Sequence, residues 1–124
     1  MPSRVRNITF DADDPMVLGR FWAEVTGYEL DVESDDEVAF LRSTDGSANI
    51  LIQPVPEPKT AKNRVHLDLQ PDVRRDEEVE RLLGIGATVV DDRREPDGSG
   101  WVVMADPEGN EFCVERSRAE RGED

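Results

Sequence analysis

The chain consists of two similar halves, and this internal repeat constrains its fold more than any other feature. The stretch around Asn7 alternates polar and apolar residues, and the stretch around His66, 59 residues later, does the same. Gly27 and Gly86, which are expected to end the helix of each half, are also 59 residues apart. Matching signals at a constant offset indicate a duplicated unit rather than two unrelated halves.

The first half predicts one strand, one helix and three further strands. Period-two alternation of apolar residues is typical of half-buried strands, and turn-forming residues separate the short strands that follow the helix. The strands are expected at residues 5–12, 28–33, 38–43 and 48–54, with the helix at residues 15–26. In the first strand, Asn7 is expected on the polar face.

The predicted helix has clear start and stop signals. Asp14 can accept hydrogen bonds from free backbone N–H groups, Pro15 suits the first helical position, and Gly27 suits a left-handed stop. Phe21 and Trp22 belong to an apolar stripe at helical spacing. We therefore expect both rings in the core rather than stacked on a ligand.

The second half repeats this order after a proline-spaced linker at residues 54–63, which cannot lie inside a sheet. The strands are expected at residues 64–70, 88–91, 101–105 and 111–115, and the helix at residues 72–84. Module one then covers about residues 4–54 and module two about residues 64–116, in a single domain. The charged stretch 117–124 lacks apolar anchors, which predicts a frayed tail.

Composition excludes several classes of protein. Lys and Arg total 15 against 29 Asp and Glu, a net charge of -14 that argues against nucleic acid or anionic membrane partners. The single cysteine, Cys113, allows no intrachain disulfide. No apolar run reaches the 18 or more residues that a membrane span requires. A cytoplasmic location is expected.

Three motifs of the chain are Phe21-Trp22, the strand Val65-His66-Leu67-Asp68-Leu69 and the turn Asp106-Pro107-Glu108-Gly109-Asn110. Together they resemble the vicinal oxygen chelate superfamily, which includes glyoxalase I, bleomycin-resistance proteins, extradiol dioxygenases and fosfomycin-resistance enzymes. The stretch from Gln53 to Lys59 is similar to the small glyoxalase-like domain branch. The resemblance implies an α+β fold in which tandem βαβββ modules form curved, barrel-like mixed sheets around a cavity, with the helices outside.

The resemblance also implies where a divalent metal ion would bind, on the first and last strand of each module. The first-strand positions are Asn7 and His66, of which only His66 is a strong ligand. The glutamate of the family falls on Cys113, while Glu115 shares the same strand face. On the last strand of module one, Gln53 is the residue able to coordinate.

Two interpretations of the cavity remain open. In the first, His66, Glu115 and Gln53, with Asn7 as a further candidate, hold one divalent ion (Zn, Ni, Mn, Fe or Mg), and Glu115 acts as a catalytic base. In the second, there is no metal, and His66 is a hydrogen-bonding residue of a ligand pocket. Cys113 is then a small apolar filler, although a thiol can also serve as a soft ligand.

Function is expected to follow the same division. The main expectation is a glyoxalase/bleomycin-resistance-like protein that binds a small organic molecule around His66. Asn7 and Gln53 would add polar contacts, and Trp101 and Phe40 would line the pocket unless they pack in the core. The alternative is a metal-dependent lyase, isomerase or dioxygenase. The resemblance implies a homodimer, and a protein-interaction module with basic partners remains a third possibility.

Overall fold

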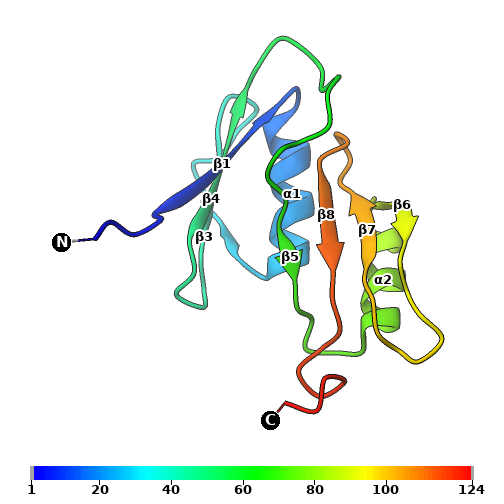
Figure 1. Cartoon of the computed structure of the whole chain (residues 1–124). Coiled ribbons are helices and arrows are strands. Elements are labelled where there is room, and N and C mark those ends of the chain that lie inside the picture. Colours follow the sequence, from blue (N-terminus) through cyan, green and yellow to red (C-terminus); the bar gives the residue numbers. More distant parts are fainter. Residues whose placement is uncertain (1, 124) are drawn as a thin grey trace. The chain divides into compact units, whose positions relative to one another are not determined.

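The computed structural model describes residues 2–123, which divide into one unit up to Pro58 and a second unit from Lys59 onward. In each unit one helix packs on one face of a four-stranded mixed sheet (Figure 1). The order of elements in each unit is strand, helix and three strands. The predicted α+β fold of tandem βαβββ modules is therefore confirmed.

The first unit has the strand order β1-β4-β3-β2, in which β1 and β4 run parallel and the other pairs run antiparallel. Its elements are β1 (Asn7–Ala12), α1 (Pro15–Thr26), β2 (Glu29–Leu30), β3 (Ala39–Arg42) and β4 (Asn49–Pro54). β2 is shorter than predicted because the Asp31 carboxylate accepts a hydrogen bond from the Glu33 N–H at 2.9 Å and turns the chain.

Helix α1 begins and ends where the sequence predicts. The Asp14 carboxylate accepts a hydrogen bond from the Val17 N–H at 3.2 Å, and Gly27 ends the helix at a φ of 75°. Trp22 is fully buried, with the rings of Phe10 and Phe21 edge-on to its indole at centroid distances of 5.3 and 5.4 Å. The expectation that Phe21 and Trp22 are core residues is confirmed.

The second unit has the equivalent strand order β5-β8-β7-β6, with β5 and β8 parallel. Its elements are β5 (Asp68–Leu69), α2 (Arg75–Gly84), β6 (Thr88–Asp92), β7 (Val102–Ala105) and β8 (Glu111–Val114). α2 begins three residues later than predicted, and the residue before it, Arg74, makes no side-chain cap. Three acidic residues in the first turn take over the favourable interaction with the helix dipole.

Strand β5 is only two residues long, although the alternation predicted a strand over residues 64–70. The reason lies in Asn63, whose side-chain oxygen accepts a hydrogen bond from the Glu111 N–H at 3.0 Å. Its side-chain amide also donates to the Glu111 carbonyl at 3.2 Å. An amide side chain thus occupies the backbone groups of β8 that a longer β5 would have used, and His66 precedes the paired strand.

Neither sheet closes into a barrel. Each is an open sheet with two edge strands, β1 and β2 in the first unit and β5 and β6 in the second. Four strands are too few to close a sheet on itself, because closed barrels of the familiar kind use about eight strands. The barrel-like closure expected from the resemblance is thus not seen within either unit.

Within the stretch 117–124, for which the sequence predicts a frayed tail, two residues contact the rest of the second unit; residue 124 lies outside the described part. Ser117 is buried, and the Glu120 carboxylate accepts hydrogen bonds from the Ser117 and Arg75 N–H groups at 3.0 and 2.7 Å. The carboxylate caps the start of α2 from a distant part of the chain. Neither α1 nor α2 has the length and apolar character that crossing a bilayer requires.

Candidate functional site

One face of the second sheet carries polar side chains from neighbouring strands. Because side chains alternate along β8, Glu111, Cys113 and Glu115 share one face, while the residues between them point into the core. Asp68 is the register partner of Cys113, and paired residues project from the same face. His66, two residues before Asp68, projects to this face as well.

Strand β7 and the residue before it add an apolar wall. Val103 is paired with Cys113 on the other side of β8, and Trp101 lies two residues before Val103. Trp101 is 45% exposed, so much of its indole is available for contact with a planar or apolar group.

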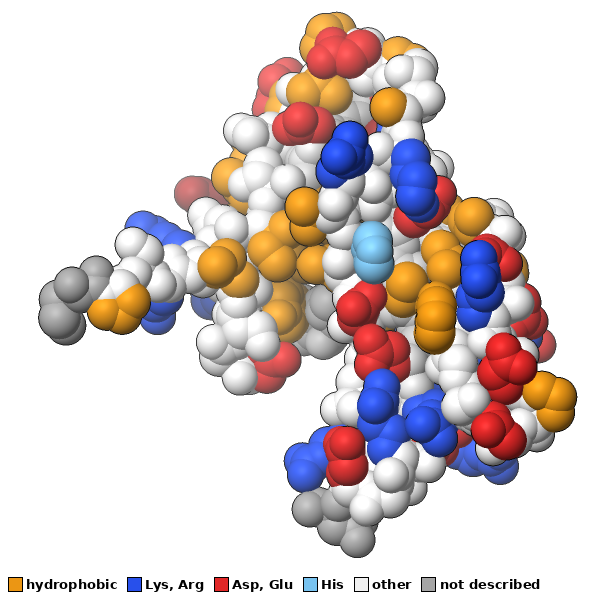
Figure 2. All heavy atoms as spheres, in the orientation of Figure 1, with side chains coloured by type: hydrophobic (Ala, Val, Ile, Leu, Met, Phe, Trp, Pro, Cys, Tyr) orange, Lys and Arg blue, Asp and Glu red, His pale blue; other side chains and the backbone are white. Residues whose placement is uncertain are grey.

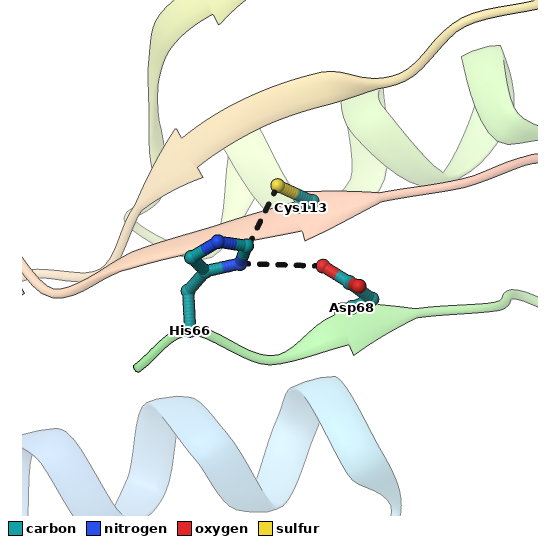
Figure 3. Close-up of side chains that lie close together, drawn as sticks. All are labelled: His66, Asp68 and Cys113. Carbon is teal, nitrogen blue, oxygen red and sulfur yellow. Dashed lines mark hydrogen bonds and ion pairs between the residues drawn. The ribbon is translucent and has the colours of Figure 1, made fainter. Parts of the chain in front are cut away.

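His66, Asp68 and Cys113 form a cluster at the centre of this face (Figure 3). Nδ1 of His66 lies 3.3 Å from Oδ1 of Asp68 and 3.9 Å from Sγ of Cys113. The imidazole, carboxylate and thiol donor atoms all lie within 4.8 Å of one another. His66 and Asp68 are exposed whereas Cys113 is buried, so the cluster has a closed floor and an open side.

The two glutamates on either side of Cys113 are each held by a cation. Nζ of Lys62 lies 2.6 Å from Oε1 of Glu111, and Nη2 of Arg121 lies 2.6 Å from Oε1 of Glu115. Such partly exposed ion pairs stabilise the fold only slightly. Their larger effect is to place one side-chain ion pair at each end of the His66 cluster.

A cleft of about 430 Å³ opens on this face. The single histidine is open to solvent there, with acidic side chains beside it (Figure 2). The residues that line the cleft are Lys62, His66, Asp68, Gly100, Trp101, Val103, Glu111, Cys113, Glu115 and Arg121. All of them belong to the second unit.

One wall of the cleft is the loop between β6 and β7, and the buried Arg75 holds this loop in place. Arg75 is 4% exposed, and its Nη1 lies 3.1 to 3.2 Å from the carbonyl oxygens of Gly98, Ser99 and Gly100. Hydrogen bonds from a charged donor are stronger than those between neutral groups. The side chain therefore fixes the loop that leads into Trp101.

The Cys113 thiol is not activated as a nucleophile. Burial raises its pKa from 9.0 to about 11, and the negative charges of Asp68, Glu115 and Glu111 act in the same direction. Reactive cysteines have the opposite character, with a pKa lowered by nearby positive charge. A Cys–His mechanism of nucleophilic catalysis is therefore disfavoured at neutral pH.

We expect the Cys113 thiol of the metal-free protein to react about 100-fold more slowly with iodoacetamide at pH 8 than in the unfolded chain, because its thiolate fraction is that much smaller. Because the folded state keeps its proton to higher pH, the stabilising contribution of the protonated thiol is complete below pH 9. It is lost as the pH rises through about 11. A reaction rate that levels off near pH 9 would contradict this prediction; urea-unfolded protein supplies the reference rate.

The residues proposed from the sequence fall into two groups. His66, Glu115 and Trp101 line the cleft, as does Cys113. The remaining candidates, Asn7, Gln53 and Phe40, lie in the first unit on β1, β4 and β3.

Within the first sheet, Asn7 and Gln53 are not neighbours. The parallel register of β1 and β4 places Asn7 opposite Asn49, and Gln53 opposite Asp11. The Asn49 side-chain amide donates to the side-chain oxygen of Asn7 at 3.4 Å. The side-chain oxygen of Asn7 therefore already has a hydrogen-bond donor within the first sheet.

Sequence reasoning missed three groups of the site, namely Asp68, the Lys62–Glu111 pair and Arg121. Asp68 had a usable signal, because a residue two positions after His66 on a strand shares its face. Lys62 and Arg121 had none, since they belong to the predicted linker and the predicted frayed tail. Only the folded chain brings them to the ends of β8.

Tandem βαβββ modules are the arrangement that the resemblance to the vicinal oxygen chelate superfamily implies, and the structure contains them. The sequence model of the family described as "Glyoxalase-like domain" matches residues 7–115. The chain therefore belongs to the glyoxalase-like domain family, within the vicinal oxygen chelate superfamily. No curated protein sequence matches the chain significantly.

Solved structures share the fold at low sequence identity. A glyoxalase/bleomycin resistance protein/dioxygenase family enzyme from Burkholderia phytofirmans is 17% identical, with a TM-score of 0.70 over 90% of this chain and 97% of that one. A lactoylglutathione lyase from Agrobacterium tumefaciens is 23% identical, with a TM-score of 0.63 over 92% and 93% of the two chains.

A third similar structure contains a metal. It is a mutant of the fosfomycin resistance protein FosX from Listeria monocytogenes, in complex with Mn(II) and 1S,2S-dihydroxypropylphosphonic acid. It is 19% identical, with a TM-score of 0.71 over 94% of this chain and 92% of that one. At these identities the similarity is evidence for the fold alone.

The residues around His66 fit a divalent ion of the zinc type. A tetrahedral zinc site with bonds of about 2.0–2.3 Å has donor atoms roughly 3.3–3.7 Å apart. The His66–Asp68 separation of 3.3 Å lies in this range and the His66–Cys113 separation of 3.9 Å slightly above it, while the Asp68 and Cys113 donor atoms lie within 4.8 Å of each other. The fit is thus to His66, Asp68 and Cys113, all in the second unit.

Proposed function

We propose that this protein binds a small organic molecule in the cleft around His66, as a glyoxalase/bleomycin-resistance-like protein. The observation that carries the proposal is the cleft itself, whose volume of about 430 Å³ lies in the range of ligand pockets. Such pockets combine apolar surface with a few placed polar groups. Here Trp101 and Val103 supply the former, and His66 and Asp68 supply the latter.

The chemistry of the lining favours a ligand with a flat apolar part and polar substituents. The half-exposed indole of Trp101 offers a face for stacking. His66 can donate or accept a hydrogen bond, and the carboxylate of Asp68 accepts. Lys62 and Arg121, already bonded to glutamates, add donors at the rim.

A thermal-shift and NMR screen of small aromatic and oxygen-rich compounds tests this proposal. We expect hits whose affinity falls at least about tenfold in both His66→Ala and Trp101→Ala, since each loses a direct contact of roughly 1.4 kcal/mol or more. Val65→Ala is the matched control, because Val65 is 79% exposed and does not line the cleft. Hits that bind both cleft variants as tightly as the parent protein would refute the proposal.

The second candidate is a divalent-metal-dependent lyase, isomerase or dioxygenase that uses His66, Glu115 and Gln53, with Glu115 as the base. What favours it is that His66 and Glu115 line the same cleft. Against this particular set, Glu115 is bonded to Arg121, and Asp68 lies next to His66. Two further expectations from the sequence, a homodimer and a cytoplasmic location, also remain predictions.

A further inference from the structure

The cluster at the centre of the cleft has the composition of a soft metal site. His66, Asp68 and Cys113 contribute an imidazole nitrogen, a carboxylate oxygen and a sulfur, and these atoms lie within 4.8 Å of one another. Manganese and magnesium prefer sites made of oxygen, whereas a thiolate beside an imidazole selects zinc or another soft ion. Three protein ligands also leave one tetrahedral position open, as in zinc sites that bind water or substrate.

The backbone holds two of the three side chains, Asp68 and Cys113, in this arrangement before any ion binds, and His66 lies just before the paired strand. The Cys113 N–H donates to the Leu67 carbonyl at 2.9 Å, and the Glu115 N–H donates to the Leu69 carbonyl at 2.8 Å. These bonds lock the register in which Asp68 faces Cys113. Sites on paired strands are more rigid than sites on loops, so an ion would find Asp68 and Cys113 preorganised.

The charges around the cluster also suit a divalent ion. A metal-bound cysteine is deprotonated, so Asp68 and Cys113 together would supply two negative charges. The neighbouring acids Glu111 and Glu115 are bonded to Lys62 and Arg121. They are therefore placed to shape the surroundings of the ion rather than to bind it.

We propose that His66, Asp68 and Cys113 bind one zinc-class divalent ion through Nδ1, a carboxylate oxygen and Sγ, with the fourth position open to the cleft. This ligand set differs from the set of His66, Glu115 and Gln53 that the resemblance implies. It lies within one unit and contains sulfur. The proposal goes beyond small-molecule binding and does not depend on it, because the metal alone is the probe.

Cobalt(II) titration of the chelator-stripped full-length protein tests this proposal. We expect one cobalt ion per chain and a sulfur-to-cobalt charge-transfer band in the near ultraviolet. The visible absorption bands should be as intense as those of tetrahedral cobalt(II), and they should disappear when zinc displaces the cobalt. Cys113→Ser should remove the charge-transfer band. His66→Ala and Asp68→Asn should each weaken cobalt binding by more than the roughly 10–100-fold that loss of an outer-shell partner costs.

Glu115→Gln is the matched control, because Glu115 lines the same cleft but is not a ligand in this proposal. Its cobalt spectrum should keep the charge-transfer band, and its affinity should change less than that of Asp68→Asn. Circular dichroism verifies that each variant is folded. The proposal is overturned if neither ion binds at millimolar concentration, or if cobalt binds without a sulfur band. Binding that survives Cys113→Ser unchanged but is lost in Glu115→Gln would also overturn it.

Discussion

Replacing Gly100 with alanine is expected to lower the free energy of unfolding by at least about 2 kcal/mol and to disturb the cleft. Gly100 has a φ of 92°, where side chains are strained, and an added Cβ would overlap the backbone carbonyl oxygen of Arg93. Backbone atoms cannot rotate away from such an overlap, so the loop itself must move. Because Gly100 lines the cleft beside Trp101, the movement should be visible at that indole.

Gly98→Ala separates the overlap from the backbone strain. Gly98 has the same φ of 92°, but nothing lies within 4 Å of an added Cβ. The Gly98→Ala variant should lose only the roughly 1–2 kcal/mol of unfolding free energy that a left-handed conformation costs a residue with a side chain. Urea unfolding measures both variants, and acrylamide quenching of Trp101 fluorescence reports on the cleft. Equal losses in the two variants would show that the packing against Arg93 is not important.

Replacing Arg75 with methionine is expected to destabilise the protein by about 2–3 kcal/mol, because it removes the hydrogen bonds between a buried charged donor and its carbonyl acceptors. Nη1 of Arg75 serves three successive carbonyl groups of the β6–β7 loop. Without it, the loop amide of Glu95, which donates to the Ser99 carbonyl at 3.0 Å, should exchange faster with solvent. Urea unfolding and hydrogen exchange followed by NMR measure the two effects.

Arg74→Met provides the matched control for Arg75→Met. Arg74 is the adjacent residue, carries the same charge and is exposed, so its replacement should change stability by no more than about 0.5 kcal/mol. Arg75→Lys should recover only part of the loss, since an ammonium group lacks the planar fork of the guanidinium. A stability of Arg75→Met equal to that of Arg74→Met would contradict the role assigned to this side chain.

The fold was largely predictable because its signals are local. Asp14, Pro15 and Gly27 delimit α1 through the conformations that their own side chains favour, and the alternation around Ile50 marks a strand with one buried face. The bounds of some elements were predicted less well, because β2 and β5 are shorter than expected and α2 begins later. At β5 and at the start of α2, the structure depends on Asn63 and Glu120, whose side chains bond to backbone groups 48 and 45 residues away. No local sequence pattern predicts such long-range hydrogen bonds.

The site was predictable in its centre but not in its composition. The repeat identified His66, and strand alternation placed Glu115 on the same face. The register of β5 against β8 brings Asp68 beside Cys113. It depends on which backbone groups of the two strands pair, so the sequence of either strand alone does not predict it. The Arg75 contact with the β6–β7 loop likewise joins two segments that the sequence separates by more than a strand.

An NMR titration with a hit compound and with zinc tests most directly whether the cleft around His66 is the binding site. The chain has a single histidine and two tryptophans, so the imidazole and both indole signals are readily assigned. We predict that the compound shifts the His66 imidazole and the Trp101 indole, that zinc shifts the His66 imidazole, and that the buried Trp22 indole stays in place. Saturating binding that leaves the His66 imidazole unmoved, while signals of the first sheet shift, would contradict this assignment of the site.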